Sequence, residues 1–200
     1  PPPPEGTPCP FLMVDDSYVN GFDAMYQWDF HVDWTNPANS TFGNSGHPNA
    51  TNAVAPFDST FDGGRNNIPQ PGTAQKLDAI ADRLMHRVQY RNFNSYETLV
   101  ASHTVDAGVN HAGVRWYVME RANPAAGFGL ADQGTHAPDS AHRWMGSAAL
   151  DGQGNLAVGY SCSDTNIYPS IRYAGRLATD PTGSLYQGEA EMYTGSGSQT

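Results

Sequence analysis

Four arginines set among aromatic and apolar residues are the side chains of this sequence best suited to binding a carboxylate. Arg115 lies in Gly-Val-Arg-Trp-Tyr and Arg172 in Ser-Ile-Arg-Tyr, and Arg143 and Arg176 also lie beside apolar residues. A planar guanidinium can donate two parallel hydrogen bonds to a carboxylate, so arginine is common in such sites. The other candidates for a ligand site with these arginines are Tyr117, Tyr173, Asp106 and Glu120.

A structural role competes with ligand binding for two of these arginines. Arg115 and Arg172 occupy equivalent positions in the internal repeat described below, and a residue that recurs in each repeat is more often structural. A guanidinium in a strand with apolar alternate positions is partly buried, so it needs an acid or several carbonyl groups within hydrogen-bond reach. We expect the acids at repeat-equivalent positions, Asp106 and Asp164, to be these partners.

An acidic turn near the N-terminus is the candidate metal site. Asp15, Asp16, Asn20 and Asp23 supply the oxygen atoms that Ca²⁺ prefers. Their spacing differs from that of an EF-hand, because Tyr18 stands where an oxygen ligand is needed. The sequence also contains no His-Glu-x-x-His or Cys-x-x-Cys signature for zinc. An irregular calcium site is therefore a possibility that the sequence leaves open, and no cofactor is certain.

The elements that position these residues follow from hydrophobic alternation. Apolar and polar residues alternate without a break over residues 26–34, which predicts a half-buried strand. In that strand we expect Trp28, Phe30 and Val32 to be buried and Gln27, Asp29 and Asp33 to be more exposed. Further strands are predicted over residues 84–92, 96–106, 113–121, 142–150, 155–163 and 170–177.

Three parts of the chain follow from these patterns. Residues 1–14 are predicted to be a Pro-rich tail or linker. Residues 15–83 are predicted to hold the N-terminal strand and a long surface excursion rich in Asn, Pro, Gly and Ser. Within them, residues 74–84 fit either a short helix or a loop. Residues 84–200 are predicted to form two successive repeats.

An internal repeat of about 55 residues indicates the architecture. Three pairs of segments match in the same order: 103–106 with 161–164, 113–117 with 169–173, and 132–134 with 186–188. Each unit holds four short strands, so the predicted fold is all-β with propeller blades, each a four-stranded antiparallel sheet. A sandwich built from duplicated halves is the alternative. Because a ring needs roughly four to eight blades, we expect a partial propeller or fragment that needs further blades or other subunits.

Composition excludes some classes of partner and suggests a compartment. The formal net charge is −10, which argues against sequence-independent binding to nucleic acid. No apolar run approaches the roughly 20 residues that a membrane-spanning helix needs. Two glycosylation sequons begin at Asn39 and Asn49, and Lys76 is the only lysine, as in many exported proteins. Cys9 and Cys162 form either one disulfide or two free thiols.

Several longer runs resemble a family of large secreted bacterial proteins that are mostly uncharacterised and similar to sialidase-type β-propellers. The resemblance covers residues 15–200 and is carried by residues 28–34, 36–40, 69–78, 82–85, 90–93, 103–106, 113–117, 143–147 and 168–173. It implies a propeller fold and a secreted or extracellular location, and it implies no particular activity. The sequence departs from the family at Cys162, and the Ser-x-Asp-x-Gly-x-x-Trp turn typical of sialidases is absent.

Two functions from different classes fit these observations. The first is a non-catalytic extracellular propeller module for binding, adhesion or surface assembly, with a glycan or a protein at the cell surface as its partner. The second is part of a sialidase-like glycan-active hydrolase whose site needs further blades. Such enzymes combine an arginine cluster, a tyrosine nucleophile and an acidic partner. Convergence of these groups on one pocket would favour the enzyme, whereas scattered pairs would favour the module.

Overall fold

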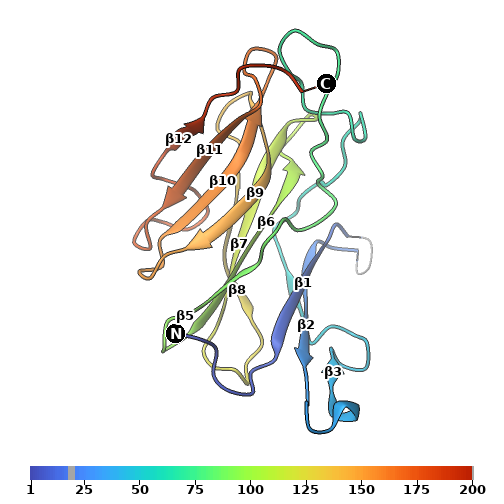
Figure 1. Ribbon diagram of the computed structural model, residues 1–200, viewed down its shortest axis with the longest axis vertical. Coiled ribbons are helices and arrows are strands. Elements are labelled where there is room, and N and C mark those ends of the chain that lie inside the picture. The colour runs from blue at the N-terminus through green and yellow to red at the C-terminus, as the bar shows by residue number, and fades with distance from the viewer. Residues whose placement is uncertain (18–20, 200) are drawn as a thin grey trace.

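The computed structural model describes residues 1–17 and 21–199, and in them the chain forms three four-stranded antiparallel sheets (Figure 1). The N-terminal sheet contains β1 (Cys9–Asp15), β2 (Ala24–His31), β3 (Thr41–Phe42) and β4 (Ala50–Ala53). The middle sheet contains β5 (Gln89–Asn92), β6 (Glu97–Asp106), β7 (Ala112–Arg121) and β8 (Gly129–His136). The C-terminal sheet contains β9 (His142–Leu150), β10 (Leu156–Ser163), β11 (Ser170–Arg176) and β12 (Glu189–Tyr193). The all-β prediction is therefore confirmed.

The middle and C-terminal sheets are successive meanders with the same topology. Their strand orders are β5-β6-β7-β8 and β9-β10-β11-β12, and neighbouring strands are antiparallel in both. Arg115 lies on β7 and Arg172 on β11, so each occupies the third strand of its sheet. The predicted repeat of two four-stranded units is confirmed at the level of strand order.

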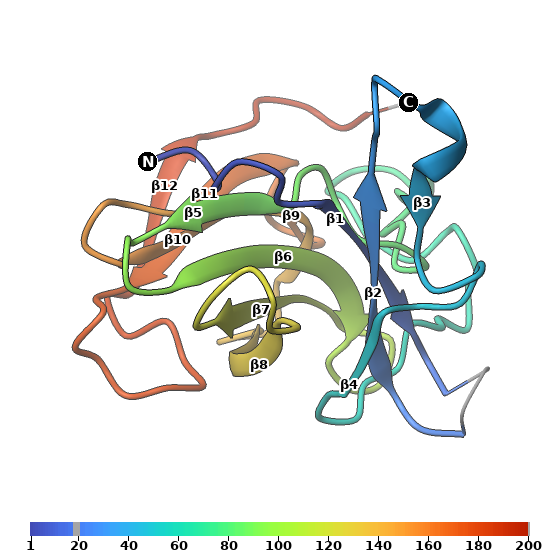
Figure 2. The same cartoon turned by 90° about the horizontal axis from the view of Figure 1, so that it is seen from below.

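The three sheets form a stack in which the middle sheet is covered on both faces (Figure 2). Side chains alternate between the faces of β7, so Val114 and Trp116 share one face and Tyr117 and Met119 share the other. The first pair packs against the C-terminal sheet. The second pair lies in a cluster with Met25 of β2, beneath the N-terminal sheet. Each face of the middle sheet therefore belongs to a separate apolar core.

Two glycines allow the close approach of chain segments in this stack. A Cβ atom on Gly146 of β9 would lie 2.5 Å from Cγ1 of Val114, so only glycine lets β9 pack this closely on the middle sheet. A Cβ atom on Gly134 of β8 would lie 2.7 Å from Cζ2 of Trp116. Both contacts are with buried side chains that have little room to move. We therefore expect alanine at either position to disturb the core of the middle sheet.

The N-terminal region differs from its prediction in two places, and in a third the loop alternative holds. Residues 9–14 belong to β1, so the extended tail ends earlier than the expected residue 14. Residues 74–84 contain no helix. The long excursion is not only a surface loop, because Ile68 and Ala79 are fully buried beside Trp144 of β9. It therefore packs across the end of the C-terminal sheet.

The predicted orientation of the strand over residues 26–34 is wrong. Gln27 is fully buried, whereas Phe30 is 38% exposed and the strand ends at His31. Gln27 faces the body of the molecule, where its Oε1 accepts a hydrogen bond from the backbone N of Phe128 at 3.3 Å. The aromatic residues of β2 instead form a cluster on the outward face of the N-terminal sheet. Alternation predicted the strand, but it did not predict which side meets the middle sheet.

Other expectations have simple outcomes. The described residues form no closed ring of blades. Cys9 is exposed and Cys162 is buried, and both are free thiols, so the disulfide alternative does not hold. Within the part of the chain that the structure describes, no helix is long and apolar enough to span a membrane.

Candidate functional site

Arg115 is buried between the middle sheet and the segment that follows β4. Its guanidinium donates to the side-chain oxygens of Thr135 and Gln133 at 3.0 and 2.8 Å, and to the carbonyl of Ala55 at 2.8 Å. It also lies 5.5 Å from the centre of the Tyr117 ring. No carboxylate is among these partners. Neutral oxygen acceptors therefore fill the positions that a ligand carboxylate would need.

The prediction that Asp106 and Asp164 are the partners of Arg115 and Arg172 is wrong. Asp106 accepts hydrogen bonds from the backbone N of Gly108, Asn110 and His111 and so closes the turn after β6. Asp164 accepts hydrogen bonds from the backbone N of Asn166 and Ile167 in the turn after β10. Both aspartates lie at the turn between the second and third strands, where unpaired backbone N–H groups are available. They recur because the turns recur.

The partner of Arg172 is Glu189 of β12. Nη1 of Arg172 lies 2.7 Å from Oε1 of Glu189, and Nη2 lies 3.7 Å from Oε2 of Glu191. Tyr160 of β10 donates its hydroxyl to Oε2 of Glu189 at 2.8 Å. Burial opposes the ionisation of Glu189, but the hydrogen bonds from Arg143, Tyr160 and Arg172 outweigh it and lower its pKa to about 2. Glu189 is therefore a permanent anion at the centre of this network.

Arg143 of β9 completes the network, and its guanidinium is fully buried. It contacts Glu189 through Nε at 2.6 Å and through Nη2 at 3.0 Å. It also contacts Asp139 through Nη1 at 2.8 Å and through Nη2 at 3.0 Å. We call Arg143, Arg172, Tyr160, Glu189 and Asp139 the Glu189 network. Its two arginines are bound to carboxylates of the chain itself, so they are not free to hold the carboxylate of a ligand.

The remaining sequence candidates do not join this network. Tyr117 is fully buried, its hydroxyl lies 2.9 Å from Nε2 of His103, and burial raises its pKa. Tyr173 points to the outward face of β11, away from Arg172, and is 43% exposed. Arg176 instead joins two sheets through Asp132 of β8, with Nη2 and Oδ2 3.0 Å apart. Arg115 and Tyr117 are thus brought together, whereas Arg172 and Tyr173 are not.

Glu189 is the residue that sequence reasoning did not assign, and strand pairing shows why. Gln133 of β8 pairs with Tyr117, two residues after Arg115, and Glu189 of β12 pairs with Ala174, two residues after Arg172. Gln133 and Glu189 are therefore structural equivalents, and each binds the arginine of its own sheet. The sequence match had placed Gln133 opposite Gln187, which precedes β12. The loop before β12 differs in length from the loop before β8, so the sequence match did not reveal that Gln133 and Glu189 are equivalent.

The acidic turn near the N-terminus interacts with the segment that follows β4. Asp16 accepts hydrogen bonds from the backbone N and the hydroxyl of Ser59 at 2.8 and 2.6 Å. Asp23 accepts one from the backbone N of Phe57 at 2.5 Å, and Asp15 accepts one from the hydroxyl of Tyr26 at 3.3 Å. The described residues include no group of three metal-ligating side chains. Asn20 lies outside the described residues, so the calcium site stays a prediction.

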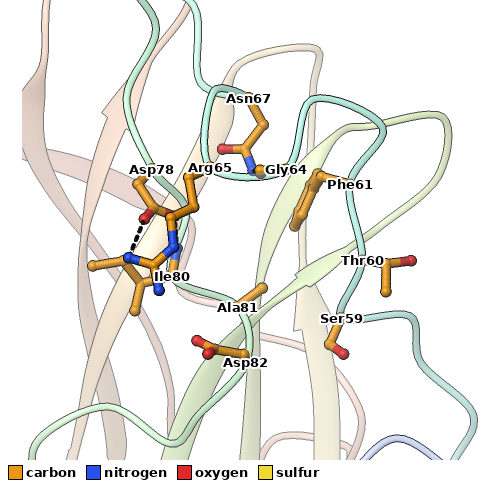
Figure 3. A pocket seen from close by; sticks show the side chains of 10 residues that line it. All are labelled: Ser59, Thr60, Phe61, Gly64, Arg65, Asn67, Asp78, Ile80, Ala81 and Asp82. Atoms are coloured by element: carbon orange, nitrogen blue, oxygen red, sulfur yellow. Dashed lines mark hydrogen bonds and ion pairs between the residues drawn. The ribbon is translucent and has the colours of Figure 1, made fainter.

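Several adjoining hollows open beside the long excursion, and we call them together the acidic groove. One, of about 290 Å³, lies between residues 59–67 and 78–82 (Figure 3). A second, of about 300 Å³, shares residues with it and reaches the end of β1, and an open hollow of about 600 Å³ adjoins both. Carboxylates of the groove are Asp15, Asp16, Asp58, Asp78 and Asp82, and its other side chains include Ser59, Thr60, Phe61, Arg65 and Asn67.

Hydrogen bonds fix the two walls of the acidic groove relative to each other. Asn67 donates to the carbonyl of Gly64 at 2.7 Å and accepts from the backbone N of Ala79 at 3.0 Å, so it joins the walls. Arg65 extends across the opening, with Nη1 3.6 Å from Oδ2 of Asp78 (Figure 3). Ile80 has a φ of +48°, which is a strained value for a β-branched residue. The groove therefore has defined walls and one backbone position held in an unfavourable conformation.

Comparison of the chain with protein-family models, with curated proteins and with solved structures found no match. Any functional conclusion consequently depends on the residues themselves. The two places where functional groups gather are the Glu189 network, which is internally neutralised, and the acidic groove, which is open to solvent.

Proposed function

We propose that this chain is a non-catalytic binding module of an extracellular protein, that its sheets are β-propeller blades, and that its ligand is a glycan at a cell surface. The proposal rests on the observation that the arginines bind partners within the chain itself. Arg115 binds neutral acceptors, and Arg143 and Arg172 bind Glu189. A sialidase-like site needs arginines that are available to a substrate carboxylate.

Support for the propeller architecture comes from the stack. Two meanders of the same strand order follow each other in sequence and pack face to face, as blades do. The arginine on each third strand binds a side chain on the fourth strand of the same sheet. The resemblance to secreted bacterial propeller proteins supports the same fold and the extracellular location.

The acidic groove is the proposed glycan site. Sugars offer hydroxyl donors, and the carboxylates of Asp78 and Asp82 can accept them. Each carboxylate is paired with an arginine, Arg65 and Arg83 respectively, and keeps further lone pairs for a sugar hydroxyl. Phe61 adds an apolar surface across the groove from Asp78, and Arg65, from the same segment as Phe61, reaches Asp78 and supplies donors. Mostly apolar pockets with a few convergent polar groups are typical small-molecule sites, and this groove combines the same elements. Its carboxylates favour a neutral or amino sugar over an anionic one.

The test is calorimetric titration of the protein with neutral, amino and sialylated oligosaccharides. We expect binding of a neutral or amino sugar and a loss of about tenfold or more in affinity for Asp82→Asn, because a charged acceptor becomes a neutral one. Glu5→Gln is the matched control, because it removes one carboxylate from the exposed N-terminal tail and should leave binding unchanged. Failure of all sugars to bind would overturn the proposal.

The hydrolase alternative has its own observation and its own test. A tyrosine, two arginines and two carboxylates do converge in the Glu189 network, which is the set of residue types that a sialidase-like enzyme uses. The buried guanidinium of Arg143 and the raised pKa of Tyr160, caused by burial and by Glu189, argue against catalysis there. Turnover of a fluorogenic sialoside that disappears in Tyr160→Phe would restore the enzyme hypothesis.

A further inference from the structure

The outward face of the C-terminal sheet carries no charged side chain on its four strands. It presents Met145, Ser147, Ala149, Ala157, Gly159, Ser161, Ile171, Tyr173 and Ala190. Ile171 and Tyr173 are 45% and 43% exposed. We call this surface the C-terminal face. A contiguous uncharged sheet surface of this kind is typical of an interaction site.

The repeat shows what the C-terminal face is built to contact. Because Arg115 and Arg172 are equivalent, Ile171 corresponds to Val114 and Tyr173 to Trp116. In the middle sheet, Val114 and Trp116 are buried beneath the next sheet of the stack. In the middle sheet, the side of the third strand opposite the arginine is therefore the side that receives the following sheet. The C-terminal face is this same side, and in the structure it is uncovered.

The opposite end of the stack is also uncovered, and it is aromatic. On the outward face of the N-terminal sheet, Phe11, Met13, Phe30 and Phe42 are exposed and Trp28 is half-buried, whereas Tyr26 on the same side is buried. Its rings contact one another, with Phe11 and Phe42 centres 5.5 Å apart and Trp28 stacked on Phe42 at 6.4 Å. The only acid on this side of its strands, Asp15, is buried. We call this surface the N-terminal face.

The two faces differ in the size of their side chains, both lack charged groups, and they lie at opposite ends of the stack. One offers large rings and the other mainly small residues, so rings from the first can pack against the shallow surface of the second. Neither places a charge in the contact, which matters for a chain with a net charge of −10. In the stack, the middle sheet contacts the preceding sheet with one face and the following sheet with the other. The N-terminal face lies on the side that would meet a preceding sheet, and the C-terminal face lies on the side that would meet a following sheet.

We propose that the C-terminal face binds the N-terminal face of a second copy of this chain. The contact is heterologous, because it joins two different surfaces, so it extends the order of sheets in one chain directly into the next chain. Repetition closes a ring if the rotation per chain allows it and otherwise gives an open filament. The acidic groove takes no part, so this proposal and the glycan-binding proposal stand or fall separately.

Sedimentation velocity between about 1 and 100 µM tests the association. We expect the mass to rise with protein concentration, and to rise further with added salt, because salt screens repulsion between acidic chains. Ile171→Glu should weaken association about 100-fold or more, because it buries an unpaired carboxylate. Val109→Glu is the matched control, since Val109 is 99% exposed in the turn after β6 and belongs to neither face.

A mixing experiment tests that the contact joins two different faces. Phe11→Glu alters the N-terminal face and Ile171→Glu the C-terminal face, so each variant alone should be monomeric. A mixture of the two should contain a heterodimer, because each variant keeps the face that the other lacks. Circular dichroism and thermal unfolding of each variant establish that it is folded.

Three results would overturn the proposal. The first is a wild-type chain that stays monomeric over the whole concentration range. The second is an Ile171→Glu or Phe11→Glu variant that associates as strongly as Val109→Glu. The third is a mixture of folded variants that contains only monomers. A self-associating Ile171→Glu variant would indicate pairing of two N-terminal faces instead.

Discussion

The middle and C-terminal sheets share a strand order but differ in how they neutralise the same arginine and in how they are covered. Arg115 of the middle sheet binds the amide oxygen of Gln133, whereas Arg172 of the C-terminal sheet binds the carboxylate of Glu189. The middle sheet is covered on both faces and the C-terminal sheet on one. The repeat therefore preserves the position of the arginine's partner and not its charge.

The difference follows from what surrounds each arginine. Arg115 has a backbone carbonyl and a threonine hydroxyl nearby, so neutral acceptors satisfy it. Glu189 lies between two arginines, and a neutral amide there would leave Arg143 with Asp139 alone and Arg172 with only the more distant Glu191. A buried cation needs either several dipoles or an opposite charge. The middle sheet surrounds Arg115 with dipoles, and the C-terminal sheet places an opposite charge beside Arg172.

The largest expected effect comes from exchanging the charged and the neutral partners of the two arginines. Glu189→Gln should lower the free energy of unfolding by about 3 kcal/mol, because two buried arginines lose their shared carboxylate. Gln133→Glu, at the equivalent position, should change it by less than about 1 kcal/mol, because an acceptor for Arg115 remains. Urea unfolding at neutral pH measures both. Equal losses in the two variants would contradict the comparison.

Acid should affect the contributions of His103 and Glu189 over different pH ranges. Burial lowers the pKa of His103 in the middle sheet from 6.5 to about 4, so between these values the unfolded chain binds a proton that the folded chain does not. Stability from neutral His103 is complete above about pH 6.5 and is lost as the pH falls toward 4. The contribution of Glu189, whose pKa is lowered to about 2, is lost only below about pH 4.5.

Unfolding free energies at pH 7.5 and pH 5 provide the measurement. We expect a loss of about 2 kcal/mol from His103 at pH 5, with His142 adding to it because burial lowers its pKa to about 4 as well. His103→Gln should reduce the difference between the two pH values, whereas Glu189→Gln should not reduce it, because loss of the Glu189 carboxylate lowers the pKa of the neighbouring His136 further. A variant His103→Gln with the full pH dependence would refute the assignment.

Effects smaller than that of Glu189→Gln are expected at the turns after the second strands. Asp106→Ala should cost about 1 to 2 kcal/mol, because three backbone N–H groups lose their acceptor. Asp164→Ala should cost about 1 kcal/mol, because two N–H groups lose theirs. Melting temperatures rank the two variants. If either loss matched that of Glu189→Gln, an ion pair with arginine would have to be reconsidered.

Much of the strand content was predictable because it depends on local sequence. Alternation predicted β9 at its observed bounds, 142–150, and β6, β7, β10 and β11 to within one residue at each end. Strand order in the two repeats followed from the repeat itself. The short strand β12 lacks clear alternation and was expected only from the repeat, and residues 74–84 have a helical spacing that tertiary contacts override.

The candidate site was less predictable, because it depends on residues that are far apart in the sequence. Arg143 and Glu189 meet only when β9 and β12 belong to the same sheet, at a register that the sequence match had misaligned. The acidic groove likewise forms where residues 59–67 meet residues 78–82 and the end of β1.

The sequence by itself determined which segments are strands, where they turn and that two units repeat, because backbone pleating and turn chemistry act over a few residues. Only the tertiary structure decided which face of each strand is buried and which acid meets which arginine. β2 illustrates the reason: it has Met25 and Gln27 on one side and Trp28 and Phe30 on the other. The buried side is the one that the middle sheet covers, and that contact is made by residues about a hundred positions away, such as Phe128.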